Sequence, residues 1–148
     1  MNNTKWLFTI LMMSLSIIGC TSTEVKPIDI FGEDMCSQCR MAISDQSFAS
    51  EIIDQQGDIF KFDDIGCLLK FKERSADLKI SAIFLKDYNS KAWMPYEKST
   101  IVETNIKTPM GSGKVAFIDS LKAKEFSAQH PMTAIETCNH SCCSEGTE

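Results

Sequence analysis

The sequence predicts an α+β fold, because short β-like runs and two helical segments follow one another along the chain. The 148 residues are 43% hydrophobic and 24% charged, which is typical of a folded domain and excludes a disordered or fibrous chain. A polar stretch with Pro27 precedes this region and a cysteine-rich stretch follows it. We therefore expect one folded domain over residues 31–132.

The first predicted element is a β-hairpin. Residues 48–54 and 59–62 favour β structure, and they flank a polar turn at residues 55–58 that contains a glycine. This combination is typical of two antiparallel strands joined by a tight turn.

A helix is predicted next, with Asp63 or Asp64 as its N-cap and Arg74-Ser75 near its end. Its apolar side chains recur at helical spacing, as Ile65, Leu68 and Leu69 show. We favour capping over a chemical role for this carboxylate pair. The apolar run at 80–85 then predicts a strand buried on both faces, so the first half has the order ββαβ.

The second half partly echoes the first. Its predicted strands cover residues 92–94, 100–103 and 114–118. A glycine-rich loop at 108–113 precedes the last of these strands, and Asp119 opens a helix that extends to about Gln129.

The N-terminus has the features of a targeting segment. Lys5 precedes an apolar run at residues 6–18, which is too short to span a bilayer comfortably. The run closes on Ile-Ile-Gly-Cys20, which resembles a bacterial lipoprotein signal that is cut before a lipid-bearing cysteine. We expect residues 1–19 to be the signal peptide and 20–30 a tether; the alternative is an ordinary signal peptide with a coincidental cysteine.

This interpretation predicts a protein held in the cell envelope by a lipid on Cys20, on the periplasmic side. Thr21 stands where an Asp would suggest retention in the inner membrane, which favours the outer membrane. The net charge is −5 and no basic run follows the first ten residues, so we expect no nucleic-acid partner. The sequence has neither a G-x-S-x-G, an H-E-x-x-H nor a P-loop motif, so we expect no enzyme.

Sulfur is the compositional excess, with seven Cys and eight Met. Cys36 and Cys39 are separated by two residues and can bind one metal ion, and Met41 follows at a spacing that places it beside Cys39 in an extended segment. Met110 lies in the glycine-rich loop, where a role in the core is harder to assign. Thiolates and thioethers favour Cu(I), whereas Zn(II) sites seldom use Met.

Two other interpretations of Cys36 and Cys39 stay open. The pair can form a structural disulfide in a binding lipoprotein, with Met41 filling the core. It can also serve a thiol-disulfide oxidoreductase, but such a motif belongs at a helix N-terminus and here a predicted hairpin follows.

The remaining donors have simpler explanations. Cys67 falls within the first predicted helix, and we favour a buried small hydrophobe over a ligand. His130 is best explained at the end of the second helix. Residues 133–148 are expected to form a flexible tail whose donors bind metal or form disulfides: Cys138, His140, Cys142 and Cys143.

Taken together, four segments from Asp34 to about His130 resemble the NosL lipoproteins, which are copper-binding accessory proteins of nitrous oxide reductase. They are Cys36-Ser37-Gln38-Cys39-Arg40-Met41, Phe62-Asp63-Asp64-Ile65-Gly66-Cys67, Trp93 and Thr108-Pro109-Met110-Gly111-Ser112-Gly113.

The resemblance implies two related ββαβ modules that bind Cu(I). It implies delivery of copper to the copper-sulfide cluster of the reductase, together with an ABC transporter complex in the membrane. It assigns Cys39, Met41 and Met110 as ligands, with Cys36 at the more variable first position. Many members have Gly where this chain has Arg40, a change that affects the turn or adds a positive charge.

Overall fold

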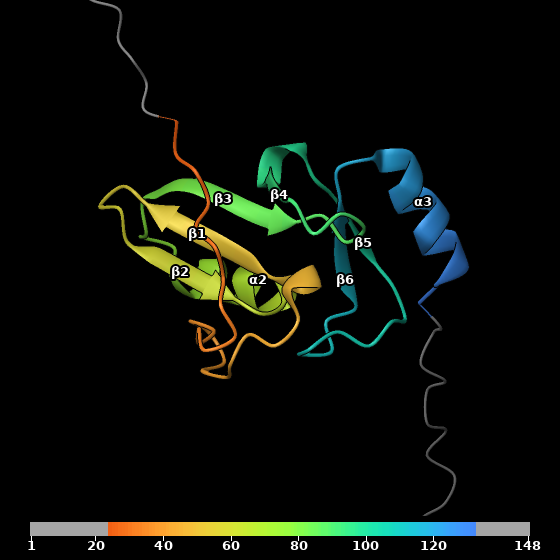
Figure 1. The fold of residues 1–148 in the computed structure, drawn as a ribbon, viewed down its shortest axis with the longest axis horizontal. Coiled ribbons are helices and arrows are strands. Elements are labelled where there is room, and N and C mark those ends of the chain that lie inside the picture. The colour runs from red at the N-terminus through yellow and green to blue at the C-terminus, as the bar shows by residue number, and fades with distance from the viewer. Residues whose placement is uncertain (1–23, 133–148) are drawn as a thin grey trace, which may run out of the picture.

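The computed structural model describes residues 24–132 and has the α+β architecture that the sequence predicts (Figure 1). A four-stranded antiparallel sheet has the strand order β2-β1-β3-β4, and a separate two-stranded sheet pairs β5 with β6. The strands are β1 (Ser50–Asp54), β2 (Ile59–Phe62), β3 (Ile80–Lys86), β4 (Trp93–Pro95), β5 (Thr100–Glu103) and β6 (Lys114–Phe117). The α-helices are α2 (Ile65–Arg74) and α3 (Ser120–Gln129), with short 3-10 helices at η1 (Gln46–Phe48) and η2 (Tyr96–Lys98).

The predicted hairpin is formed by β1 and β2, which pair with Ile52 opposite Phe60. Gly57 lies in the turn with a φ of 88°, a left-handed conformation that glycine adopts readily. Asp64 is the N-cap of α2, because its side chain accepts a hydrogen bond from the Gly66 N–H. Asp119 caps α3 in the same way.

The two halves differ after their helices. The first half has the order β1-β2-α2-β3, as predicted, whereas β4 joins the first sheet rather than the second. Within the described residues, the second half has the order β5-β6-α3 with no strand after the helix. The likeness between the halves therefore covers two strands and a helix.

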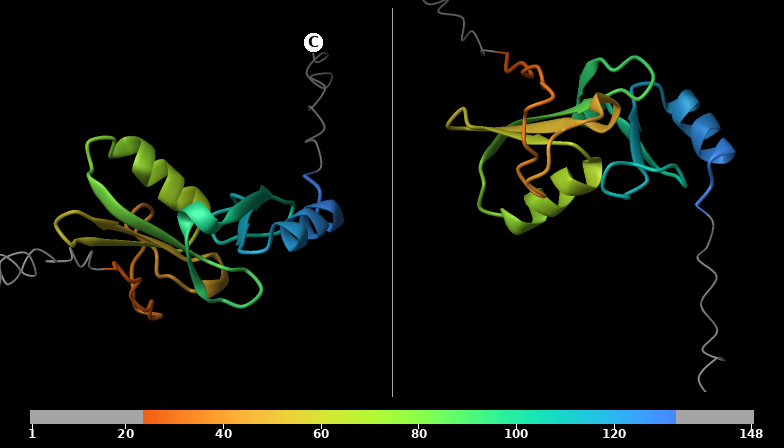
Figure 2. Two further views of the ribbon diagram at one scale, coloured as in Figure 1. Left: turned by 90° about the horizontal axis from the view of Figure 1, so that it is seen from above. Right: turned by 60° about the horizontal axis from the view of Figure 1, so that its bottom comes forward.

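The main sheet is covered on both faces, and Figure 2 shows α2 on one side and the N-terminal segment on the other. All five residues of β1 are buried as a result. Part of the expected tether belongs to this cover: Ile30 is buried in the core, and the Ile28 N–H donates to the Glu51 carboxylate at 3.0 Å. Packing against the domain thus begins before residue 31.

A second apolar cluster lies between β6 and α3. It contains the buried residues Phe48, Val115, Phe117 and Ala123. A backbone hydrogen bond of 2.9 Å joins this part to the segment that follows β3, from the Tyr88 N–H to the Ala116 carbonyl. Over residues 24–132, neither helix has the length and apolar character needed to cross a bilayer.

Candidate metal centre

A tight hairpin-like turn carries Cys36 and Cys39. Met35 and Ala42 pair across its base, the Cys36 N–H donates to the Met41 carbonyl at 2.8 Å, and the Arg40 N–H donates to the Cys36 carbonyl at 2.9 Å. The turn is also fixed to the sheet, since the Ser37 N–H donates to the Lys61 carbonyl of β2. Cys36 is fully buried beneath this turn, while Cys39 is half-buried.

Arg40 has a φ of 63°, in the left-handed region. A side chain at such a position is strained by contact between Cβ and the backbone, a strain that glycine does not have. The turn therefore keeps the conformation that suits glycine although the residue is Arg.

Four donor side chains converge below the turn. One sulfur or carboxylate oxygen from each of Cys36, Cys39, Asp63 and Cys67 lies within 4.8 Å of all the others. The Cys39 thiol donates to Asp63 Oδ1 at 3.7 Å. Asp63 and Cys67 are almost completely buried, with exposed fractions of 2% and 4%. The end of β2 and the first turn of α2 therefore bring two more donors to the cysteine pair.

Asp64 holds the glycine-rich loop against this site. Its carboxylate accepts hydrogen bonds from the Thr108 hydroxyl at 2.6 Å, the Met110 N–H at 3.1 Å and the Gly66 N–H at 2.6 Å. Burial would raise the pKa of Asp64, but these bonds and one from Ser112 outweigh it and hold the pKa below its usual value. Asp64 is thus a charged bridge between the two halves of the domain.

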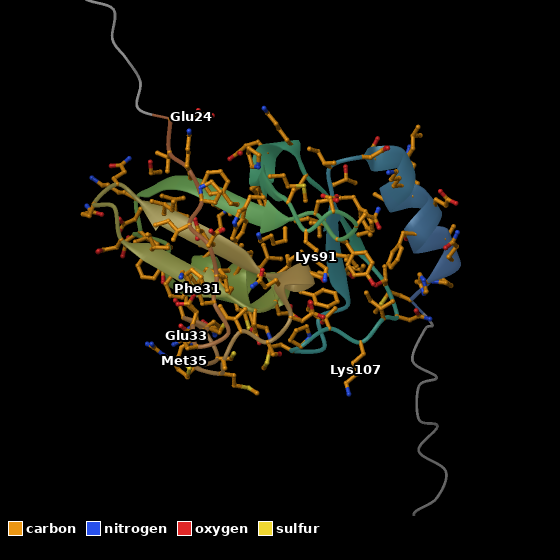
Figure 3. The ribbon with its side chains drawn as sticks, viewed as in Figure 1. Glu24, Phe31, Glu33, Met35, Lys91 and Lys107 are labelled. Atoms are coloured by element: carbon orange, nitrogen blue, oxygen red, sulfur yellow. The ribbon has the colours of Figure 1, made fainter. Side chains whose placement is uncertain are left out.

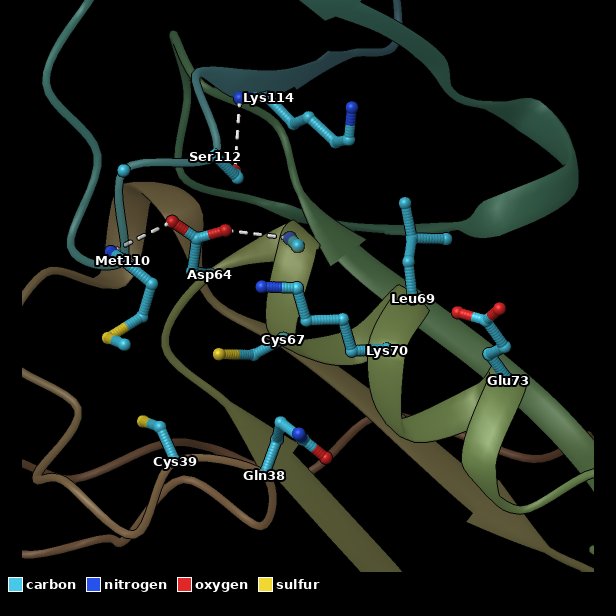
Figure 4. Close-up of a pocket in the computed structure, with 12 residues that line it drawn as sticks. Gln38, Cys39, Asp64, Cys67, Leu69, Lys70, Glu73, Met110, Ser112 and Lys114 are labelled. Carbon is cyan, nitrogen blue, oxygen red and sulfur yellow. Dashed lines mark hydrogen bonds between the residues drawn. The ribbon is translucent and has the colours of Figure 1, made fainter.

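A cavity of about 400 Å³ opens beside the thiols. Figure 4 shows the sulfur atoms of Cys39, Cys67 and Met110 directed toward the same space. Met110 is 41% exposed, so the cavity connects the buried thiols to the surface. Lys70 and Lys114 also line it.

Burial raises the pKa of the Cys39 thiol, and the nearby Cys36 and Asp63 add to this effect. The pKa of Cys67 is raised more strongly by burial and by the neighbouring cysteines. A metal ion must therefore displace thiol protons when it binds. A reactive cysteine of an oxidoreductase needs a lowered pKa and a helix N-terminus, and Cys39 has neither.

The structure brings together three of the four predicted ligands. Cys36 and Cys39 lie in the thiol cluster, and Met110 lies on the cavity wall. Met41 is 55% exposed and does not line the cavity. Met35 is a further exposed thioether on the same turn, labelled in Figure 3. The cysteines at 36, 39 and 67 are free thiols, so no disulfide joins them.

Two residues of the cluster were not predicted as ligands. Cys67 is buried, as expected for a small hydrophobe, yet its sulfur also faces the cysteine pair. The sequence predicts either Asp63 or Asp64 as the helix cap; Asp64 performs that function, and Asp63 points to the thiols. The sequence does contain one indication that Asp63 and Cys67 lie close together. They are four residues apart, a spacing that places them on the same side of the start of a helix.

Other predicted sites are outside or away from this cluster. Cys20 and the tail with Cys138, His140, Cys142 and Cys143 lie outside the described residues. His130 is the C-cap of α3, as expected, and its ring lies 4.5 Å from the Phe126 ring.

Comparison with known proteins identifies the family. The NosL family model matches residues 27–136. The crystal structure of the copper chaperone NosL from Shewanella denitrificans is similar in fold, with a TM-score of 0.63 and 15% sequence identity, covering 73% of this chain and 90% of that chain. No curated protein sequence matches significantly. The family match spans most of the chain and includes both cysteines of the turn and the glycine-rich loop, so the chain belongs to the NosL family.

Proposed function

We propose that this protein is a Cu(I)-binding metallochaperone without catalytic activity. The observation that carries the proposal is the convergence of three free thiols beside a cavity whose wall includes Met110. Soft sulfur ligands favour Cu(I) over harder ions. Membership of the NosL family and likeness to a protein named as a copper chaperone support the same cargo.

The proposed ligands are Cys39, Met110 and Met41, assisted by Cys36. Cys39 is the central donor, because it lies both in the thiol cluster and on the cavity wall. Met110 provides a thioether from the second half of the domain, and Met41 follows Cys39 on the surface. A thioether needs no deprotonation, so a mixed site can hold copper and release it without moving a proton at every donor.

We propose that the copper is delivered to nitrous oxide reductase. The support is the family resemblance, which implies assembly of the copper-sulfide cluster together with an ABC transporter complex. The proposed location is the periplasmic side of the envelope, through a lipid on Cys20, with the outer membrane favoured. The support for the location is the N-terminal sequence.

An anaerobic Cu(I) titration against a chromophoric chelator tests the function. Reduced protein should compete for one Cu(I), and the variant Met110→Leu should bind at least tenfold more weakly. Met132→Leu is the matched control, because Met132 is exposed and does not line the cavity. Equal affinity of Met110→Leu, Cys39→Ser and the unchanged protein would contradict the proposed site.

A further inference from the structure

We propose that Arg40 and Arg74 form a binding site for carboxylate groups, through which an acidic segment of a partner protein docks beside the metal cavity. The inference rests on the proposed function only in that the partner would exchange copper with this protein. The site itself rests on the two arginines and on the cavity that they line.

The use of arginine in this chain is restricted to one place. Fifteen side chains of the sequence are Lys or Arg, and all of them except Arg40 and Arg74 are Lys. These two are far apart in the sequence, yet they line the same cavity of about 270 Å³. A guanidinium differs from an ammonium group because it is planar and can bind a carboxylate through two parallel hydrogen bonds. The placement of both arginines at one cavity therefore indicates recognition of a carboxylate.

The other walls of this cavity suit the same ligand. Ser37, Gln38 and Ser75 line it with hydroxyl and amide groups that can donate hydrogen bonds. Phe71 completes the lining, and its ring packs against two aromatic side chains of β2. None of the described residues that line the cavity is an Asp or Glu. A carboxylate that enters it therefore meets two positive charges and several donors.

Within residues 24–132, neither guanidinium has a partner of its own. The two salt bridges of this part involve other residues, and neither arginine side chain forms a hydrogen bond there. A positive charge in the last turn of α2 suits the helix dipole, but Lys72 already provides one. The dipole therefore does not explain why residue 74 is Arg.

The backbone of Arg40 also has a cost that the described domain does not offset. Its φ of 63° is strained for any side chain, and such strain is often found at functional positions. Lys91 has a similar φ but lines neither this cavity nor the one beside the thiols, so the strain alone does not identify a site. Arg40 differs because its unpaired side chain shares a cavity with Arg74.

The arginine cavity adjoins the metal cavity. Gln38 lines both of them. Lys70 is exposed, lines the metal cavity and lies one helical turn before Arg74 on α2. An acidic segment that pairs with Arg40 and Arg74 can therefore extend across Gln38 to Lys70. Docking there would place the partner at the mouth of the metal cavity.

The position of the site favours a protein over a membrane surface. Figure 3 shows Glu24, where the described chain begins, and Met35, on the 36–41 turn, at opposite edges of the domain. The turn therefore faces away from the side on which the proposed lipid anchor precedes the domain. A concave site with hydroxyl donors also suits one carboxylate side chain better than a flat layer of charged headgroups.

A fluorescently labelled octaglutamate peptide is the probe, and fluorescence anisotropy measures its binding to reduced, metal-free protein at about 20 mM salt. The protein is the chain that the proposed processing leaves, residues 20–148, with Cys20 changed to Ser so that it carries no lipid. Since the whole chain is acidic, with a net charge of −5, general attraction cannot produce binding. We expect saturable binding of octaglutamate and none of octaglutamine.

The variants separate the two arginines from charge in general. Arg40→Gln combined with Arg74→Gln should weaken octaglutamate binding at least about tenfold. Lys72→Gln combined with Lys91→Gln is the matched control, because it removes the same charge from α2 and from a left-handed turn position, and it should weaken binding by less than about twofold. Arg40→Lys combined with Arg74→Lys keeps the charge but loses the planar geometry, and should weaken binding about threefold or more. Circular dichroism establishes that each variant is folded.

Two results with the peptide would overturn the carboxylate site: equal losses in the Gln pair and its Lys control, or full affinity in the Arg→Lys pair. Two other sources of oxyanions are tested in parallel. The chain should not bind vesicles of phosphatidylglycerol and phosphatidylcholine, and sulfate should displace the peptide no more than chloride of equal ionic strength. Vesicle binding that requires both arginines, or displacement specific to sulfate, would overturn the assignment to a protein carboxylate.

Failure of this inference is distinguishable from failure of the proposed function. Neither arginine is a proposed copper ligand, so the Arg→Gln pair should keep its Cu(I) affinity. Loss of the peptide site with Cu(I) binding intact would overturn this inference alone. Absence of Cu(I) binding with the peptide site intact would overturn the copper function and leave the carboxylate site standing.

Discussion

At the scale of single residues, Arg40 has a strained backbone, at the position where the family resemblance implies a change in the turn. Its φ of 63° places an Arg where a Gly is unstrained, at a cost of about 1–2 kcal/mol, part of which the greater freedom of glycine in the unfolded chain offsets. We expect Arg40→Gly to raise the free energy of unfolding by about 0.5–1 kcal/mol. Urea denaturation of the apoprotein measures it.

Lys91 provides the comparison, because its φ is 58° and it lies in a different turn. Lys91→Gly should produce a similar gain, since the backbone strain is the same in kind. A loss of stability in Arg40→Gly alone would mean that the Arg side chain supports its turn.

The thiols make metal binding depend on pH. The pKa values of Cys39 and Cys67 are raised by burial, so both are protonated at neutral pH and release protons when a metal binds. Apparent affinity should therefore rise with pH, by about tenfold per pH unit for each thiol that loses a proton. Chelator competition between pH 6 and 8 measures the slope. Cys67→Ser should flatten the slope if Cys67 binds the ion, and an affinity independent of pH would contradict thiolate ligation.

At the scale of elements, Asp64 does more than an ordinary helix cap. It caps α2, and it holds the loop that contains Thr108 and Met110. We expect Asp64→Ala to lower the free energy of unfolding by about 2–4 kcal/mol, since a cap is lost and buried donors are left unpaired. Thermal or urea unfolding measures this, and copper affinity should fall with it because Met110 is released.

Asp119→Ala is the matched control, because Asp119 caps α3 at an exposed position and should cost only about 1 kcal/mol. The contribution of Asp64 to stability also depends on pH, and the direction of this dependence follows from its lowered pKa. Its contribution to stability is present above the pKa of the unfolded chain and is lost as pH falls through the lower folded value. Equal losses in the two Ala variants would contradict the bridging role.

The elements themselves were predictable because their signals are local. The turn at Gly57 and the caps at Asp64 and Asp119 mark where strands and helices begin and end, and the structure has them there. The pairing of β4 with β3 was not predictable, since short strands carry no signal for their partners. The same holds for the roles of Asp63 and Cys67, which depend on α2 facing the 36–39 turn in the folded chain.

At the scale of the whole molecule, the candidate site depends on contact between the two halves. The thiols belong to the first half, and the loop with Met110 belongs to the second. Besides the bonds of Asp64, the Ile118 N–H donates to the Asp87 carboxylate across the same junction. Disturbing this junction should therefore alter metal binding without changing any sulfur ligand.

The N-terminal part of the described chain packs against the main sheet and contributes to its core. Ile30 is 3% exposed, the Ile28 N–H donates to Glu51 Oε1, and among the described residues the other oxygen, Glu51 Oε2, has no hydrogen-bond partner. A chain that begins at Phe31 should be less stable than one that begins at Glu24 by about 2–4 kcal/mol, because a core side chain and a hydrogen bond to a buried carboxylate are lost. Urea unfolding of the two chains measures the difference.

Ile30→Ala in the longer chain should reproduce most of the loss, whereas Ile28→Ala keeps its backbone N–H and should have a smaller effect. Equal stability of the two chains would mean that the segment is only a tether, and that the domain begins at residue 31.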